Sequence, residues 1–118
     1  MKNTVITGVA AAAIGVLVGT QLPKGVVLKP ISITTFKIKI PFTQWVDGFD
    51  SKDASKMHKA YGIKPLYRGV SIKDPYQVVV IHQSAPGLVD KLLSDNQEII
   101  ESTGHVLRTT KTNYWSFN

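Results

Sequence analysis

The chain has 118 residues, enough for one small domain, and it contains no cysteine. Disulfides, thiolate metal sites and a cysteine nucleophile are therefore excluded. The formal net charge is +6, but residues 1–30 carry three lysines and no acid, and residues 31–118 carry eleven Lys or Arg against eight Asp or Glu. Because the domain is only mildly basic and its basic residues are scattered, we expect no nucleic-acid partner.

An uncharged apolar segment precedes the domain. Residues 3–23 carry no charged side chain, and a helix of about 20 apolar residues spans a bilayer core. The sequence predicts an apolar helix in residues 1–23, either a membrane anchor or a signal peptide, and a linker in residues 24–30. The expected location is membrane-anchored or exported. If the start codon is misassigned, the protein is cytoplasmic.

The domain, residues 31–118, begins with a predicted strand and helix. Residues 31–40 (ISITTFKIKI) alternate between apolar and basic side chains towards their end, which indicates a strand that stops at Pro41. Apolar residues then recur at helical spacing and predict one helix from residue 42 to about 60, with a polar and Gly-containing middle. Gly62 follows in a position that favours a left-handed cap.

Two further strands form a predicted hairpin. Residues 63–72 and 76–83 are strand-like runs separated by the turn Lys73-Asp74-Pro75. The second run is apolar on both sides, with Val78 and Val80 on one and Val79 and Ile81 on the other. Such a strand requires both faces of its sheet to be covered.

The last part of the chain predicts helix and then strand. Pro86 suits a first helical turn, and Ser94–Gln97 has the pattern of a capping box for a second helical piece that ends at Gly104. Residues 106–117 predict the final strand. The order β-α-β-β-α-β indicates an α+β, ferredoxin-like fold with a four-stranded antiparallel sheet and helices on one face.

Several runs resemble a known superfamily. They are FTQWVDGFD at 42–50, GIKPLYRGV at 62–70, Asp74-Pro75, and VVVIH at 78–82. They are similar to the dimeric α+β barrel superfamily of ferredoxin-like proteins, which includes antibiotic-biosynthesis monooxygenases, and within it to a small family of stand-alone domains without established catalytic residues. The resemblance implies that two protomers pack sheet against sheet into a barrel, so a homodimer is expected.

His82 is the candidate for a catalytic or ligand-binding residue. It ends an apolar strand, where an imidazole can act as a general base or ligand. The alternative, favoured because no orienting partner is visible in the sequence, is a structural histidine bonded to a neighbouring carbonyl or carboxylate in the core or at the dimer seam. His58 and His105 are expected at the surface. The three histidines are 24 and 23 residues apart, without the close spacing of zinc ligands, so we expect no metal and no cofactor.

Aromatic and basic residues supply the other candidates. Trp45, Phe49 and Tyr67 are weak candidates for lining a ligand pocket, although the four-residue spacing of the first two favours core packing. Trp115, with Phe117, is expected at the dimer seam. Arg68 and Arg108 either grip an anion from neighbouring strands or lie at a solvated edge.

Three functions remain open at this level. The first is a small dimeric domain that binds a small molecule in a cavity between helices and sheet. The second is a cofactor-independent, monooxygenase-like enzyme centred on His82. The third is a structural module for self-association or protein interaction. No catalytic signature is present, and a cavity that opens onto His82 favours the first two over the third.

Overall fold

The structure, a computed structural model, describes residues 29–116. The predicted apolar helix, most of the linker and Phe117 lie outside the described residues. The elements in chain order are β1 (Ile31–Ile38), α1 (Phe42–Phe49), α2 (Lys52–Ala60), β2 (Lys64–Val70), β3 (Gln77–Gln83), α3 (Leu88–Asp95), α4 (Gln97–Ser102) and β4 (His105–Trp115). The predicted order is therefore confirmed, with each helical stretch divided into two helices.

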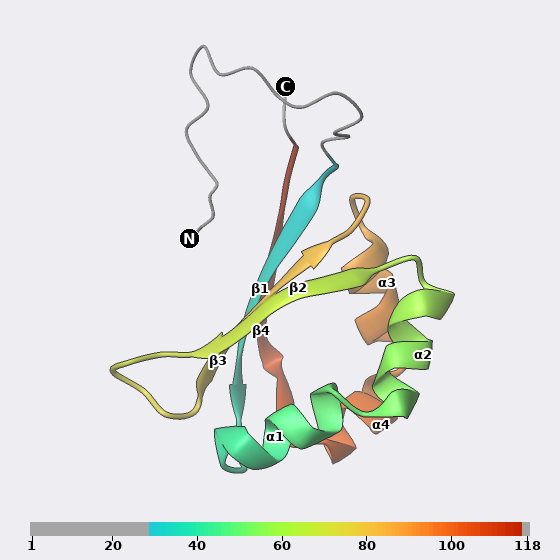
Figure 1. Ribbon diagram of the computed structural model, residues 1–118. Helices are drawn as coiled ribbons and strands as arrows, with labels where there is room; N and C mark the ends of the chain where they lie inside the picture. Colours follow the sequence, from blue (N-terminus) through green and yellow to red (C-terminus); the bar gives the residue numbers. More distant parts are fainter. Residues whose placement is uncertain (1–28, 117–118) are drawn as a thin grey trace.

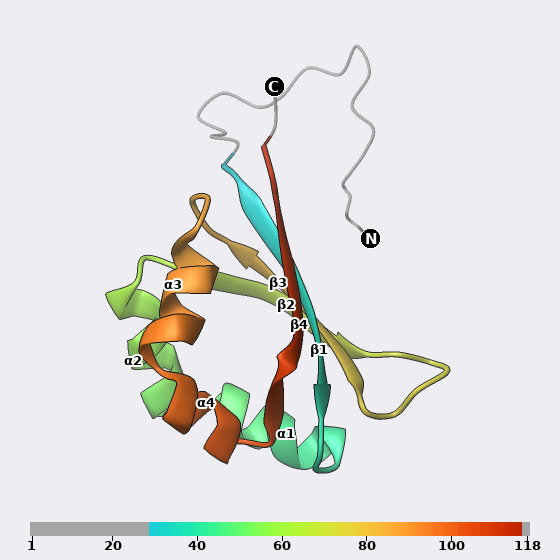
Figure 2. The ribbon, with the colours of Figure 1, turned by 180° about the vertical axis from the view of Figure 1, so that it is seen from behind.

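The four strands form one antiparallel sheet in the order β2-β3-β1-β4. This is the ferredoxin-like arrangement. All four helices lie on one side of the sheet, and the connection between β2 and β3 projects away from α2, α3 and α4 (Figures 1 and 2). The most apolar strands, β1 and β3, occupy the centre, where both of their faces can be shielded.

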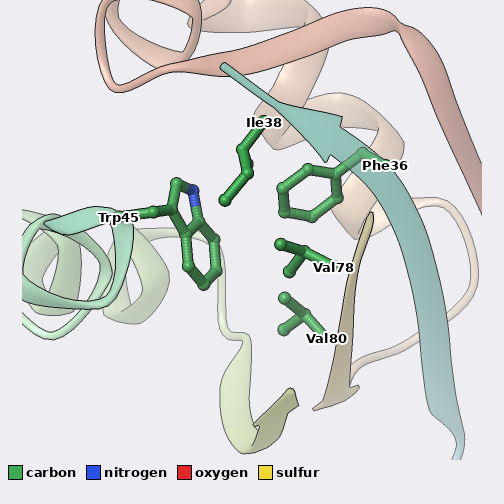
Figure 3. Packing of buried hydrophobic residues seen from close by; sticks show 5 residues of the cluster. All are labelled: Phe36, Ile38, Trp45, Val78 and Val80. Atoms are coloured by element: carbon green, nitrogen blue, oxygen red, sulfur yellow. The ribbon is translucent and has the colours of Figure 1, made fainter. Parts of the chain in front are cut away.

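Alternation along β1 and β3 divides the sheet into two faces. The helix-covered face carries the side chains of Phe36, Ile38, Val78 and Val80, which pack with Trp45 of α1 into a buried core (Figure 3). Burying each such side chain contributes roughly 1.5–3 kcal/mol. The opposite face, called the open face here, carries half-buried apolar side chains from the same two strands.

The single helix predicted over residues 42–60 is wrong, because the chain breaks at Asp50 and Ser51. Ser51 has extended backbone angles, and its hydroxyl accepts a hydrogen bond from the Ala54 amide at 3.2 Å and donates one to the Gly48 carbonyl at 2.7 Å. A serine side chain that replaces a missing backbone acceptor starts a new helix. The break turns α2 relative to α1, so that α2 can reach the sheet near β2.

The second helical stretch also differs from its prediction. Pro86 lies before α3, whose N-cap is Gly87 with φ of 86°. The capping box does not form, because Ser94 is inside α3 and the Asn96 side chain instead donates to the Leu92 carbonyl and to the Tyr61 hydroxyl. Asn96 thus ties the junction of α3 and α4 to the end of α2.

The strand ends differ from the predicted ranges by at most two residues. β1 stops at Ile38, and β4 begins at His105 because Gly104 adopts a φ of 96° and turns the chain sharply back into the sheet. Over residues 29–116, no helix has both the length and the apolar character required to span a bilayer.

Candidate ligand cavity

A cavity of about 100 Å³ lies between the helix-covered face and the four helices. We call it the central cavity. It is lined by Thr34, Phe36, Trp45, Gly48, Phe49, Ala54, Met57, His58, Val80, His82, Val89, Leu92, Leu93, Ile100, Thr103 and His105. An engineered cavity of about 150 Å³ with apolar walls binds benzene in another protein. The central cavity is therefore in the size range of a small apolar group.

All three histidines of the chain line this cavity, although they come from α2, β3 and β4. The expectation that His105 is a surface residue is wrong, since His105 is 5% exposed. The turn at Gly104 directs it onto the helix-covered face, where its ring stacks on Phe36 with centroids 3.7 Å apart. Its Nε2 lies 2.7 Å from the Thr110 hydroxyl, and desolvation by burial lowers its pKa to about 4.

His58 was also expected at the surface, and the structure places it half-buried. Its Nδ1 lies 2.8 Å from the Ala54 carbonyl. Because a carbonyl only accepts, this nitrogen carries the proton, and Nε2 keeps a free lone pair. The ring packs edge-on against Phe49, with centroids 5.1 Å apart. Burial lowers the pKa of His58, against a smaller raising effect of the Ala54 hydrogen bond.

His82 is 6% exposed, and neither of its ring nitrogens has a hydrogen-bond partner within residues 29–116. The structural interpretation required a carbonyl or carboxylate partner, and none is found in that part of the chain. The nearest aromatic rings are those of His58 at 5.2 Å and Phe49 at 6.2 Å between centroids. Desolvation, with a smaller contribution from His58, lowers the pKa of His82 to about 4.

Trp45 and Phe49 both line the cavity and pack in the core, which are the two roles expected for them. Both line the cavity, and their rings stack on each other with centroids 4.8 Å apart. Tyr67 is not brought to the cavity. It pairs with Ile81 on the open face and is 58% exposed. Trp115, which is 55% exposed, pairs with Ile31 of β1, on the same open face.

The two arginines do not form a joint site. β2 and β4 are the opposite edges of the sheet, so Arg68 and Arg108 are separated by two strands and are not on neighbouring strands as expected. Arg68 instead donates through Nη2 to the Asp50 carboxylate at 2.5 Å. This ion pair joins β2 to the end of α1.

A second hollow, called the outer cleft here, lies beside the central cavity. It is open to solvent, has a volume of about 630 Å³, and is lined by Phe49, Asp50, Ser55, His58, Lys59, Gly62, Ile63, Lys64 and Pro65. Phe49 and His58 line both hollows. No local sequence pattern predicts this cleft, because its walls come from α1, α2 and the start of β2.

The chemistry available to the central cavity is that of neutral imidazoles in an apolar enclosure. Within the described part of the chain, no three His, Asp or Glu side chains are grouped so that they could hold a metal ion. The unpartnered nitrogens of His82 and the free Nε2 of His58 can exchange hydrogen bonds with a bound molecule. Aromatic and aliphatic walls would shield that molecule from water.

Two solved structures share this fold. A NIPSNAP family protein from Agrobacterium tumefaciens aligns with a TM-score of 0.51 and 9% sequence identity, over 75% of this chain and 92% of that one. A monooxygenase from the gene ActVA-Orf6 of Streptomyces coelicolor, solved in complex with the ligand nanaomycin D, aligns with a TM-score of 0.50 and 16% identity, over 77% and 88%. The chain therefore shares the ferredoxin-like α+β fold of these two structures, the fold that the sequence predicted.

The particular family is given by the sequence comparison. A family model described as a domain of unknown function, DUF3764, matches residues 29–117. The chain belongs to the DUF3764 family. No curated protein matches the chain. Fold similarity at these identities carries no activity, because function depends on the site.

Proposed function

We propose that the domain binds a small molecule in the central cavity. The observation that carries this proposal is His82, which is buried in the cavity wall and has no partner for either ring nitrogen among residues 29–116. A buried polar group without a partner costs about 1–3 kcal/mol. A ligand that bonds to His82 removes this cost, so a wall of this kind favours binding over a purely structural role.

Trp45 offers a direct test, because it lines the cavity and the chain contains only one other tryptophan. In a Trp115→Phe background, Trp45 is the single tryptophan reporter. We expect a small molecule that co-purifies with the native protein, identified by mass spectrometry, to change Trp45 emission when it is added back to stripped protein. The proposal would be contradicted if no molecule co-purifies, or if the molecule that does co-purify leaves Trp45 emission unchanged when it is added back.

An oxygenase-like reaction in the same cavity is the alternative proposal. It is supported by the position of His82, because an imidazole nitrogen in the cavity wall without a partner among residues 29–116 can hydrogen-bond to a substrate hydroxyl and accept its proton. The test is the uptake of dissolved oxygen with hydroquinone as a probe. Uptake above the uncatalysed rate that is lost in His82→Gln supports an enzyme, and uptake equal to the background supports a binding protein.

We also propose that the domain is a homodimer joined through the open face. Ile33 and Ile81 are register partners at the middle of this face, and Tyr67 lies opposite Ile81 on the next strand. Val79 and Trp115 extend the same apolar surface. A second copy presents the same patch, as a two-fold interface requires, and the superfamily resemblance supports this occupant. Self-association through this face is compatible with ligand binding in the central cavity. A module that only self-associates or binds another protein is the third function.

For residues 1–30 we propose membrane anchoring or export, since residues 3–23 are uncharged and long enough to cross a bilayer. A reporter fused after residue 30 should fractionate with membranes or outside the cytoplasm. A reporter that stays wholly in the soluble cytoplasmic fraction would contradict this proposal, and would support the misassigned start codon.

A further inference from the structure

The central cavity and the outer cleft are neighbouring compartments of different character. Phe49 and His58 form part of the wall of each. The inner compartment has aromatic and aliphatic walls, whereas the outer one is open and includes charged side chains. A molecule that occupies both compartments must therefore have an apolar part in the central cavity and a polar part in the outer cleft. The atoms that connect the two parts would lie beside Phe49 and His58.

The charge in the outer cleft is positive. Asp50 is the one acidic residue in the part of its wall that residues 29–116 form, and it is paired with Arg68 in the ion pair described above. The side chains of the exposed residues Lys59 and Lys64 have no hydrogen-bond or ion-pair partner among residues 29–116. The amides of residues 61–63 donate hydrogen bonds to the Met57, His58 and Lys59 carbonyls at the end of α2, so these carbonyls are already bonded within the chain. An anionic group is attracted to this position.

The inner compartment excludes such a charge. Burial keeps His58 and His82 uncharged at neutral pH, and a carboxylate without a cationic partner is strongly disfavoured in an apolar enclosure. The polar contacts offered there suit an uncharged group. The two compartments therefore favour a ligand whose uncharged part lies in the central cavity and whose anionic group lies in the outer cleft.

We propose that this site binds a small aromatic carboxylic acid, with a single ring against Trp45 and Phe49 in the central cavity and the carboxylate beside Lys59 and Lys64 in the outer cleft. The proposal rests on the ligand-binding function and names its ligand class. At about 100 Å³ the central cavity accommodates no more than one ring, given that benzene occupies an engineered cavity of about 150 Å³. The two separate ammonium groups of Lys59 and Lys64 suit a carboxylate. The described residues that line the outer cleft include neither a guanidinium fork nor a glycine-rich loop of the kind that binds phosphates.

The test uses the full-length Trp115→Phe protein and four acids whose tethers grow by one carbon: benzoate, phenylacetate, 3-phenylpropionate and 4-phenylbutyrate. Each is compared with its own neutral amide through Trp45 emission. We expect the best acid to bind about three- to tenfold tighter than its amide at low salt, and the difference to shrink at high salt.

Substitution of the lysines localises the anion. Lys59→Gln and Lys64→Gln should each weaken binding of the best acid by about two- to fivefold and leave its amide unchanged. Lys56→Gln is the matched control, because Lys56 is an exposed lysine of α2 outside the outer cleft. Melting curves of all variants verify that the fold is retained.

The outcomes separate this inference from the function on which it rests. Equal binding of acid and amide, both sensed by Trp45, would overturn the aromatic-acid proposal and leave ligand binding in place. Equal weakening by Lys56→Gln and by the two cleft substitutions would also overturn it, since the effect would then be general electrostatics. If neither acid nor amide changes Trp45 emission and no molecule co-purifies, both proposals fail.

Discussion

Ser32 and His82 lie directly opposite each other on β1 and β3, and both point to the helix-covered face without a side-chain hydrogen bond in the described part of the chain. Ser32 is fully buried and His82 is 6% exposed. Two adjacent polar side chains without partners are a loss of stability in a domain that lacks disulfides. Such a loss is expected where a site serves binding in addition to folding.

The first prediction follows from this pair. His82→Leu places an apolar side chain of similar size against apolar walls and removes two unpartnered nitrogens. We expect it to raise the free energy of unfolding by about 1–3 kcal/mol, measured by denaturant titration at pH 7. The same substitution should abolish binding of any molecule that changes Trp45 emission.

The control for that prediction is His105→Leu. His105 is buried to a similar extent, but its Nε2 is hydrogen-bonded to Thr110 and its ring stacks on Phe36. We expect this substitution to destabilise the domain. A loss of stability in both variants would show that His82 stabilises the fold. That result would support the alternative in which His82 is a structural histidine.

The second prediction concerns acid. The folded pKa values of His82 and His105 are about 4, and an unfolded histidine titrates near 6.5. Between these values the unfolded chain binds more protons, so the free energy of unfolding must fall as the pH is lowered from about 6.5 to 4. Each histidine contributes a loss on the order of 3 kcal/mol by pH 4.

Melting temperatures measured from pH 7.5 to 4 test this dependence. The comparison with His82→Leu isolates one histidine from the carboxylates, which also titrate in acid. We expect a clearly smaller fall of the melting temperature in the variant than in the unsubstituted protein. Parallel curves would show that His82 is accessible to protons in the folded state.

The third prediction concerns the open face. Ile33→Lys places a charge at the centre of the proposed dimer interface, whereas Ile99→Lys makes the same change on α4, where Ile99 is 55% exposed. We expect a fragment of residues 29–118 to sediment as a dimer at tens of micromolar. Ile33→Lys should give a monomer and Ile99→Lys a dimer. A monomeric unsubstituted fragment would refute the interface.

The fourth prediction compares two glycines with left-handed backbones. Gly62 has φ of 70° and open space around it, whereas a Cβ at Gly104, with φ of 96°, would lie 2.8 Å from Ile40 Cγ1. Gly62→Ala should destabilise the domain by about 1 kcal/mol through backbone strain alone. Gly104→Ala adds the clash and should destabilise it by about 2–3 kcal/mol, measured by denaturant titration. Equal losses would show that Ile40 moves aside freely.

Features with a local signal were predictable from the sequence. The alternation in residues 31–40, the two-sided apolar run Val78–Ile81 and the turn at Asp74-Pro75 predict strands and a hairpin, and the structure confirms them. Successive side chains of a strand point to opposite faces, so the alternation of apolar and polar residues that indicates a strand can be recognised from neighbouring residues. The order of these elements then left the ferredoxin-like fold as the simplest packing, and the resemblance to the superfamily agreed.

The helix ends were less predictable because they depend on individual hydrogen bonds. Ser51 and Ser94 are both followed by plausible helical sequence, yet only Ser51 caps a helix. Which serine does so depends on where the helices meet the sheet. At Ser94, packing of α3 continued the helix past the candidate cap, because a cap contributes only about 1 kcal/mol.

The cavity was decided by tertiary structure. His58, His82 and His105 are far apart in the sequence and carry no shared motif, and only the sheet order and the turn at Gly104 bring them to one enclosure. The sequence by itself determined the strands, the two faces of the sheet and the apolar N-terminal segment, since each depends on residues that are neighbours in the chain. Tertiary packing alone decided which polar groups are buried away from water without a hydrogen-bond partner, because burial depends on elements that meet only in the folded domain.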